Sequence, residues 1–304
     1  MLSGMAILNQ TIAAFLDRHQ LPELFVRTAT EFYEPLCLWV EQRLADRQGS
    51  VPFVLGINGA QGTGKSTLAD FIYEYLAVAH DRITVVLSID DLYLTRAQRQ
   101  SLARDVHPLL GTRSVPGTHD VELGLSIIGS LKKLERGQTL LVPRFDKSTD
   151  DRFAESEWTQ ANGPVDLIIL EGWCVGSESV PDDELLLPVN DLETSEDPSG
   201  IWRNYVNRQL QDVYPQLFES LDALVFMLAP DFDCVLRWRT EQEEKLAAST
   251  SAGETRVMTK SQIKRFIQQC ERITRQNLKS LATNADVLLE LGQDHQVVSA
   301  RYKE

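Results

Sequence analysis

One stretch of this sequence, residues 59–67, constrains the fold more than any other. It reads Gly-Ala-Gln-Gly-Thr-Gly-Lys-Ser-Thr and contains the phosphate-binding loop pattern GxxxxGKS. In this pattern the glycines free backbone N–H groups to surround phosphate oxygens, the lysine supplies a point charge, and the serine hydroxyl is a ligand for magnesium. The chemistry requires a buried strand before the loop and a helix after it, because the helix directs its positive end at the anion.

The residues on both sides of the loop meet this requirement. An apolar run at 53–57 is rich in strand formers, and apolar residues from Leu68 to Leu76 recur at helical spacing. The alternative, a glycine-rich turn between two core elements, does not require this order. We therefore expect ATP binding by nine consecutive residues: Gly59, Ala60, Gln61, Gly62, Thr63, Gly64, Lys65, Ser66 and Thr67. Lys65 is also a candidate catalytic residue, and Ser66 a candidate magnesium ligand.

Strand-like and helix-like segments alternate along the rest of the chain. An apolar run at 83–89 is typical of a strand buried on both faces of a parallel sheet, and apolar runs at 140–143, 164–170, 221–228 and 285–291 also predict strands. Apolar residues at helical spacing predict helices at 6–16, 22–44, 123–134, 201–218, around 237–245 and from a capping box at Thr259 to about Ser280. This order predicts an α/β fold, a doubly wound and mostly parallel sheet with helices on both faces.

The simplest organisation is a single domain of the phosphate-loop nucleoside triphosphate hydrolase fold over residues 1–304. Residues 1–50 are expected to form an N-terminal helical extension packed on the flank of the sheet. Residues of about 180–200 are acidic, and we interpret them as a surface insertion whose charges face solvent.

Composition limits the partners and the location. The formal net charge of −14 argues against a nucleic-acid partner, because phosphate backbones are bound by clustered Lys and Arg. The four cysteines are far apart and lack metal-ligand spacing, which favours buried reduced thiols. The sequence shows neither a secretory signal nor a membrane-spanning run. We expect a cytoplasmic protein with no membrane partner, a monomer or weak homodimer.

Three acids follow predicted strands, where functional side chains of open α/β sheets gather. Asp90 and Asp91 follow the strand at 83–89, and Glu171 follows the strand at 164–170. Neighbouring side chains leaving a strand point to opposite sides, so at most one of the aspartates should reach the reacting centre. Asp90 is the candidate base, and a turn or capping role is the alternative for both. Glu171 occupies the Walker B position and is a candidate magnesium ligand.

Polar loops and one helix supply further candidates. The segments 106–120 and 144–152 carry Arg113, His119, Asp120, Arg144 and Lys147. The alternative for 144–152 is a solvated charged turn. Arg237 and Arg239 lie on a predicted helix, where arginines commonly neutralise transferred phosphate, although pairing with Glu241 and Glu243 fits equally well.

Several short motifs together resemble the phosphate-loop D-glycerate 3-kinase family of plants, fungi and bacteria. Besides the loop at 59–67, they are Leu-Ser-Ile-Asp-Asp-Leu-Tyr-Leu-Thr at 87–95, Pro-Gly-Thr-His-Asp at 116–120, Val-Pro-Arg-Phe-Asp-Lys-Ser at 142–148, Leu-Glu-Gly-Trp at 170–173 and Arg-Trp-Arg at 237–239. The resemblance covers residues of about 50–290. More distantly, the chain is similar to uridine kinases, phosphoribulokinase and bacterial pantothenate kinase.

The resemblance implies transfer of the ATP γ-phosphoryl group to the 3-hydroxyl of D-glycerate, a step of photorespiration in plants. ATP and Mg²⁺ are the implied cofactors, and Asp90 matches the base of the related kinases. A carboxylate-bearing substrate needs Arg or Lys contacts. Arg113, Arg144 and Lys147 are the candidates for this contact, and Arg144 is expected to hold the carboxylate. The full set of candidate substrate-binding residues is Asp90, Tyr93, Arg113, His119, Asp120, Arg144 and Lys147.

Two other functions stay open on the sequence. One is a kinase for another small acceptor, such as a nucleoside, pantothenate or a sugar phosphate. The other is a regulatory ATPase that changes shape with nucleotide. The NKxD motif typical of a GTPase does not occur in the sequence.

Overall fold

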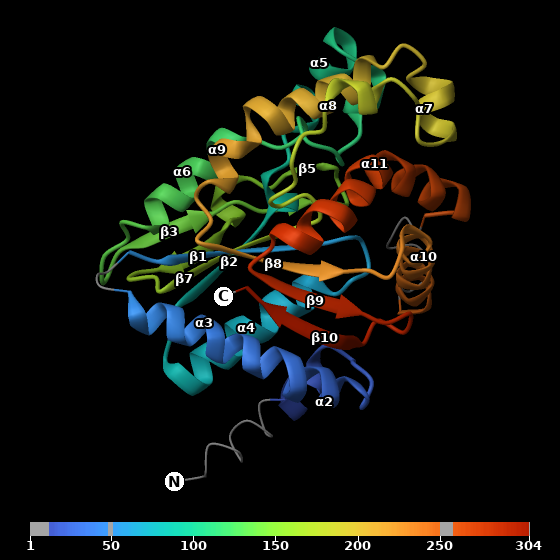
Figure 1. The fold of residues 1–304 in the computed structure, drawn as a ribbon. Coiled ribbons are helices and arrows are strands. Elements are labelled where there is room, and N and C mark those ends of the chain that lie inside the picture. Colours follow the sequence, from blue (N-terminus) through green and yellow to red (C-terminus); the bar gives the residue numbers. More distant parts are fainter. Residues whose placement is uncertain (1–11, 48–50, 250–257, 304) are drawn as a thin grey trace.

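The computed structural model describes residues 12–47, 51–249 and 258–303. At its centre lies a six-stranded sheet with the order β10-β9-β8-β1-β7-β2 (Figure 1). Its strands are β1 (Phe53–Gly59), β2 (Thr84–Ser88), β7 (Leu167–Gly172), β8 (Ala223–Leu228), β9 (Val287–Leu291) and β10 (Val297–Tyr302). β10 runs antiparallel to β9, and all other neighbouring strands are parallel. The predicted α/β fold with a mostly parallel sheet is confirmed.

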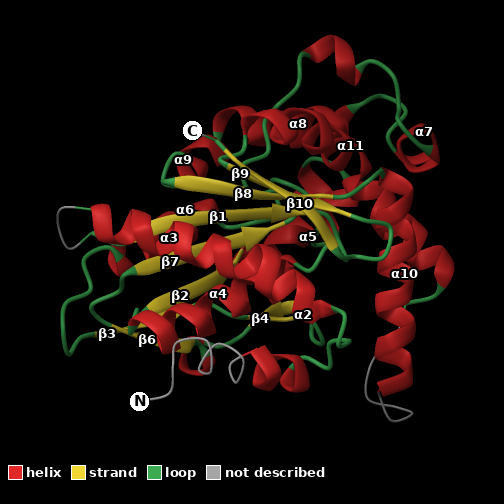
Figure 2. Cartoon of the chain, turned by 60° about the horizontal axis from the view of Figure 1, so that its bottom comes forward, coloured by secondary structure: helices red, strands yellow, loops and turns green. Residues whose placement is uncertain are grey.

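Helices cover both faces of the sheet (Figures 1 and 2). The helices are α2 (Phe25–Thr28), α3 (Glu34–Asp46), α4 (Lys65–His80), α5 (Arg96–Asp105), α6 (Val121–Leu131), α7 (Asp191–Glu196), α8 (Ile201–Asp212), α9 (Tyr214–Phe218), α10 (Phe232–Ser249) and α11 (Lys260–Asn284). α3 and α4 lie on one face, and α6, α8, α9 and α11 on the other (Figure 1). No helix within the described residues is both long and apolar enough to cross a bilayer.

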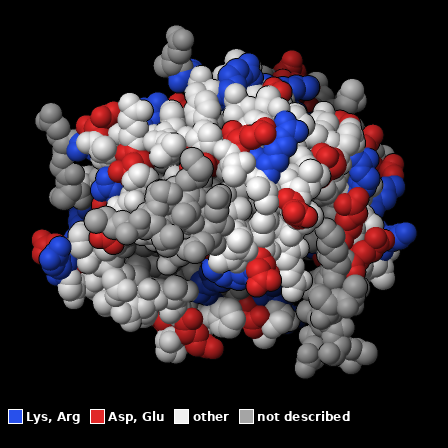
Figure 3. All heavy atoms as spheres, turned by 90° about the horizontal axis from the view of Figure 1, so that it is seen from below, with Lys and Arg blue, Asp and Glu red and all other residues white. Residues whose placement is uncertain are grey.

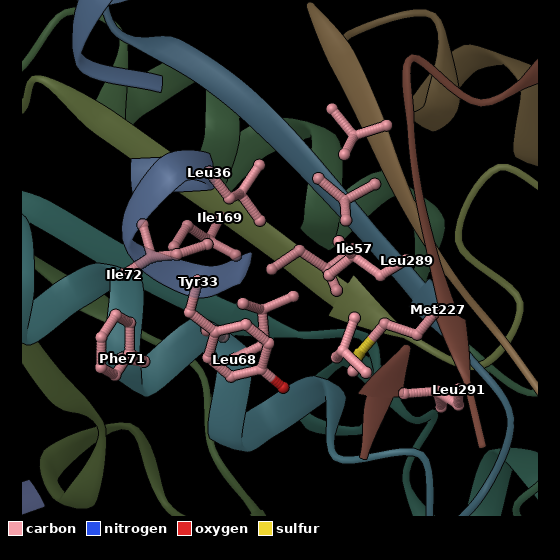
Figure 4. Packing of buried hydrophobic residues seen from close by; sticks show 14 of the residues in the cluster. Tyr33, Leu36, Ile57, Leu68, Phe71, Ile72, Ile169, Met227, Leu289 and Leu291 are labelled. Carbon is pink, nitrogen blue, oxygen red and sulfur yellow. The ribbon is translucent and has the colours of Figure 1, made fainter. Parts of the chain in front are cut away.

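The sheet separates two hydrophobic cores, because neighbouring side chains of a strand face opposite sides. Leu55, Ile57 and Ile169 pack with Leu68, Phe71 and Ile72 of α4, a cluster that Figure 4 shows from close by. Val54 and Ile168 pack on the other side, toward α6 and α8. Burial on both faces explains why the central strands are continuous apolar runs.

Two short sheets lie beside the main one. β3 (Thr139–Val142) pairs with β6 (Thr159–Asn162), and β4 (Phe145–Asp146) pairs with β5 (Asp151–Arg152). The charged cluster 144–152 therefore forms a small hairpin. The predicted single helix at 201–218 is wrong in one respect. The helix is interrupted at Val213, between α8 and α9, because Pro215 has no N–H with which to continue the hydrogen bonding of α8.

The N-terminal segment packs against α4. Residues 12–18 are helical, and residues 6–11 of the predicted first helix lie outside the described part of the chain. The second predicted helix is interrupted, since a π turn (Ala29–Tyr33) joins α2 to α3. Tyr33 lies edge-on to Phe71, with ring centroids 5.5 Å apart.

The acidic segment 180–200 agrees with the expectation of a solvated face at five acids and differs from it at two: Asp182, Asp183, Glu184, Asp191 and Glu196 are exposed, and Glu193 and Asp197 are buried. Glu193 and Asp197 are 1% and 0% exposed, and they pair with Arg272 and Arg203. Buried carboxylates need such partners, so these two ion pairs hold the segment to α11 and α8. The acidic composition of the segment therefore does not by itself predict which of its carboxylates face solvent.

The cysteines are as the sequence predicts. All four cysteines are free and buried. On the face shown in Figure 3, acidic and basic side chains are interspersed, so charges of one sign are locally compensated there.

Candidate active site

The carboxyl ends of the five parallel strands meet at one edge of the sheet, where a cavity of about 520 Å³ opens. It is lined by the phosphate loop, by residues at the end of β2 and β7 and after β9, by α10, by Lys147 and Phe266, and by residues of the N-terminal segment. The size is ordinary for a small-molecule site. The position is the one at which open α/β sheets bind ligands.

The phosphate loop adopts a conformation that only glycine allows cheaply. Gly62 and Gly64 have φ of +84° and +89°. A Cβ on Gly62 would lie 2.7 Å from Cβ of Trp238 on α10, so the loop and this helix touch without room for a side chain. The Thr63 hydroxyl donates to the Ala60 carbonyl at 2.9 Å. α4 begins at Lys65 and presents its N-terminal end to the cavity.

Ser66 and Glu171 meet at the mouth of this loop. The Ser66 hydroxyl donates to Oε1 of Glu171 at 3.2 Å, and Glu171 is 5% exposed. Its second oxygen, Oε2, is buried without a hydrogen-bond partner among the described residues. A hydroxyl beside an unsatisfied buried carboxylate oxygen fits Mg²⁺, which takes one or two protein oxygens and completes its shell with phosphates and water.

Asp90 lies in the same cavity, two residues beyond β2. Its carboxylate accepts from Nζ of Lys147 at 2.7 Å and from the Tyr93 hydroxyl at 3.1 Å. Burial by itself raises the pKa of the Asp90 carboxyl, but Lys147, with help from Lys65, lowers that pKa to about 2. Asp90 is therefore ionised and held by a cation.

Asp91 faces the other way. Its carboxylate accepts from the backbone N–H of Phe145 at 3.0 Å and lies 3.3 Å from Arg144. Burial raises the pKa of this carboxyl above its ordinary value. Asp91 thus fixes the start of the β4–β5 hairpin, and Asp90 alone of the pair lines the cavity.

An aromatic cluster backs Asp90. Tyr93 stacks on His119 with ring centroids 4.5 Å apart, and Phe145 lies edge-on to Tyr93. Nδ1 of His119 lies 2.6 Å from the Tyr214 hydroxyl, and Nε2 is buried without a partner in the described chain. Burial lowers the pKa of His119 to about 4, so the ring is neutral at pH 7.

The other predicted polar residues form ion pairs within the protein. Arg113 pairs with Asp150 beside the Phe145 ring. Asp120 caps α6 through the backbone N–H of Leu123 and accepts from Arg152 at 3.1 Å. The structure brings Lys147, Asp90 and Tyr93 together, while Arg113, Arg144 and Asp120 do not line the cavity.

Comparisons with known proteins show the family of the chain. No family model matches the chain. The uncharacterized kinase mug58 of Schizosaccharomyces pombe is 37% identical over 215 residues, which cover 66% of this chain and 74% of the relative. The chloroplastic D-glycerate 3-kinase of Arabidopsis thaliana is 31% identical over 237 residues, 73% of this chain. The chain belongs to the P-loop kinase family that includes D-glycerate 3-kinase.

The match to the plant enzyme spans only 49% of that protein's length. Among solved structures, D-glycerate 3-kinase from Cryptococcus neoformans superposes with a TM-score of 0.72. That alignment covers 89% of this chain and 99% of the other, at 23% identity. It shows that this P-loop kinase shares the whole fold of that protein.

The two arginines of α10 have different surroundings in this kinase. Arg239 lines the cavity and pairs with Glu243, and it also donates to Gln242 at 3.0 Å. Arg237 points toward Gln293 and donates to Sγ of Cys234 at 3.1 Å. The intrahelical pairing that the sequence left open is thus present for Arg239, at the edge of the cavity.

Several lining residues were not among the predicted site: Ser88, Trp238, Glu241, Gln242, Phe266 and two further groups. The turn after β9 contributes Asp294, His295 and Gln296, and His295 lies 3.1 Å from the Gly62 carbonyl of the phosphate loop. The rule that functional side chains follow strand ends would have pointed to this turn. The second group comes from the N-terminal segment, at 21–33, and no sequence signal marks it.

Proposed function

We propose that this protein is an ATP-dependent kinase that transfers the γ-phosphoryl group to the 3-hydroxyl of D-glycerate, giving 3-phospho-D-glycerate. One observation carries the proposal. The Ser66–Glu171 contact and the Asp90–Lys147 pair share one cavity, at the ends of the neighbouring strands β7 and β2. A donor site and an ionised acceptor base are thus adjacent. The name of the plant relative supports D-glycerate as the acceptor.

The donor half uses the phosphate loop. Loop N–H groups and Lys65 would hold the phosphates of ATP, and Ser66 and Glu171 would hold magnesium. A bound magnesium ion would neutralise charge on the phosphates. Arg239 stands at the edge of the cavity, where it would add charge compensation once it leaves Glu243.

The acceptor half depends on an exchange of partners. A pKa of about 2 makes Asp90 a weak base, since a general base works best when its pKa lies near the working pH. D-glycerate brings its own carboxylate, which competes with Asp90 for Lys147. When Lys147 moves to the substrate, the pKa of Asp90 rises, and its freed oxygen accepts the proton of the 3-hydroxyl.

The remaining candidates take supporting roles. Lys147, rather than Arg144, is assigned to the substrate carboxylate, because Lys147 lines the cavity while Arg144 is paired with Asp91. Arg113 and Arg144 do not line the cavity, and we propose that they hold the segment that carries Lys147 in place, through Asp150 and Asp91. Tyr93 orients Asp90 through its hydroxyl, and His119 supports the Tyr93 ring by stacking on it. Asp120 caps α6 and pairs with Arg152, so its role is to fix the loop before that helix.

The direct test is ATP consumption with magnesium, with and without D-glycerate, and identification of the product by NMR. We expect turnover that depends on the acceptor and yields the 3-phosphate. Asp90→Asn should lower kcat by about 10²–10⁴-fold, the usual contribution of a general base. Lys147→Met should raise the KM for glycerate far more than the KM for ATP, and more than Arg144→Met does. Slow hydrolysis that ignores glycerate would contradict the proposal.

A further inference from the structure

The cavity extends past the phosphate loop to a wall built by the N-terminal segment. Leu21, Pro22, Phe25 and Tyr33 line it there, next to Gln296 of the turn after β9. Three of these four N-terminal side chains are apolar, and the fourth, Tyr33, is 2% exposed. This wall therefore differs in chemistry from the phosphate end of the cavity.

Contacts within the core hold this wall in place. Phe25 is 8% exposed and lies edge-on to Tyr33, which in turn contacts Phe71 of α4. The Thr28 hydroxyl donates to Oε1 of Gln296 at 2.9 Å, which ties the N-terminal segment to the turn after β9. The segment is thus fixed to the helix that follows the phosphate loop and to the far side of the cavity.

The charges of the cavity indicate which part of a nucleotide each wall suits. Lys65 and the loop N–H groups serve phosphates, and the α10 wall carries Arg239 and Glu241. A flat heteroaromatic base instead gains by covering apolar surface. Since Oε1 of Gln296 accepts from Thr28, the amide Nε2 of this side chain offers donors to ring nitrogens of a base.

We propose that the base of the nucleoside triphosphate lies between residues 21–25 and the turn at 292–296. The N-terminal helices then form part of the nucleotide site, besides packing on the sheet. This inference rests on the proposed function for its use of ATP, and it adds the base-binding residues.

The test compares two aspartate substitutions in the same segment. Leu21→Asp places a charge on the wall, and Leu24→Asp is the matched control, because Leu24 is 59% exposed and does not line the cavity. Dissociation constants are measured by calorimetry for magnesium ATP and for magnesium tripolyphosphate, which has no base. We expect Leu21→Asp to weaken ATP binding by about tenfold or more, because a charge must be desolvated under the base. Tripolyphosphate binding should stay unchanged, and Leu24→Asp should alter neither ligand.

A second variant tests the same proposal if Leu21→Asp does not fold. Gln296→Glu keeps an oxygen for Thr28 and replaces the amide donor, so it should weaken ATP binding more than tripolyphosphate binding. Unchanged ATP binding in both variants would overturn the inference, and so would equal losses for the two ligands. If the unaltered protein binds neither ligand, the proposed function itself fails.

Discussion

At the scale of single residues, two adjacent aspartates have opposite tasks. Asp90 lines the cavity and pairs with Lys147, and Asp91 accepts from the backbone of Phe145. The alternation of side chains along a strand led to this expectation. In the structure β2 ends at Ser88 and both aspartates lie in a 3-10 turn, Ile89–Leu92, which directs them to different sides. Which cation would meet Asp90 was not predictable, since the path of the loop that carries Arg144 and Lys147 depends on tertiary contacts.

The Asp90–Lys147 pair makes a prediction about titration. The pKa of Asp90 lies near 2, below its ordinary value of 3.8, so the stability that ionised Asp90 contributes is present above pH 3.8 and is lost as the pH falls toward 2. Lys147→Met should raise this pKa toward its ordinary value, because burial is then less opposed, and should thereby reduce or abolish the stability that ionised Asp90 contributes. Carbon-13 NMR of the carboxyl group measures the pKa directly. Arg144→Met is the control, and an equal shift in that variant would contradict the assignment of Lys147.

At the scale of elements, strong local patterns were predicted well and weak ones were not. β1 and α4 combine apolar periodicity with a loop that marks their boundary. The capping box at Thr259 correctly marks the start of α11. β4 and β5 have two residues each, and β10, at a sheet edge, has one buried position, the others being intermediate or exposed. Strands this short or this mixed carry no distinctive pattern, so only pairing with neighbours defines them.

The contact between the phosphate loop and α10 can be tested with a pair of glycines. Gly62 and Gly64 both have positive φ, but a Cβ on Gly64 meets nothing within 4 Å, while a Cβ on Gly62 collides with Trp238. Gly64→Ala should cost about 1–2 kcal/mol of unfolding free energy through the backbone alone. Gly62→Ala should cost a further 1–3 kcal/mol, roughly, from overpacking. Denaturant unfolding without nucleotide measures both changes in the free energy of unfolding. Equal decreases in the two variants would show that α10 moves away from the added Cβ at no cost.

At the scale of the whole molecule, the strands of one sheet contribute side chains to both hydrophobic cores and end at the cavity. Strands that end at the cavity are buried on both faces, so a ligand held by their ends is linked to folding of the entire described structure. The site was predictable to the extent that it follows strand ends: the loop at 59–67, Asp90 and Glu171. The wall at 21–33 was not, because nothing local distinguishes its residues from ordinary core.

Linkage predicts a magnesium-dependent gain in thermal stability. ATP at 100 times its dissociation constant should stabilise the fold by about 2.7 kcal/mol. Removing magnesium with EDTA should reduce the gain. Ser66→Ala and Glu171→Gln should reduce it similarly even with magnesium present, because both side chains are assigned to the ion. Differential scanning calorimetry checks this, and a gain in either variant that still responds fully to EDTA would exclude that residue as a ligand.

The β4–β5 hairpin lies outside the six-stranded sheet, yet it carries Lys147 to the cavity. If the proposed roles hold, one of the groups that would contact the acceptor is carried by a part of the chain built separately from the phosphate loop. Exchange of this hairpin between related proteins would then alter acceptor preference while the phosphate donor stays the same. Transplanting residues 144–152 between relatives is therefore a natural route to new substrate preferences.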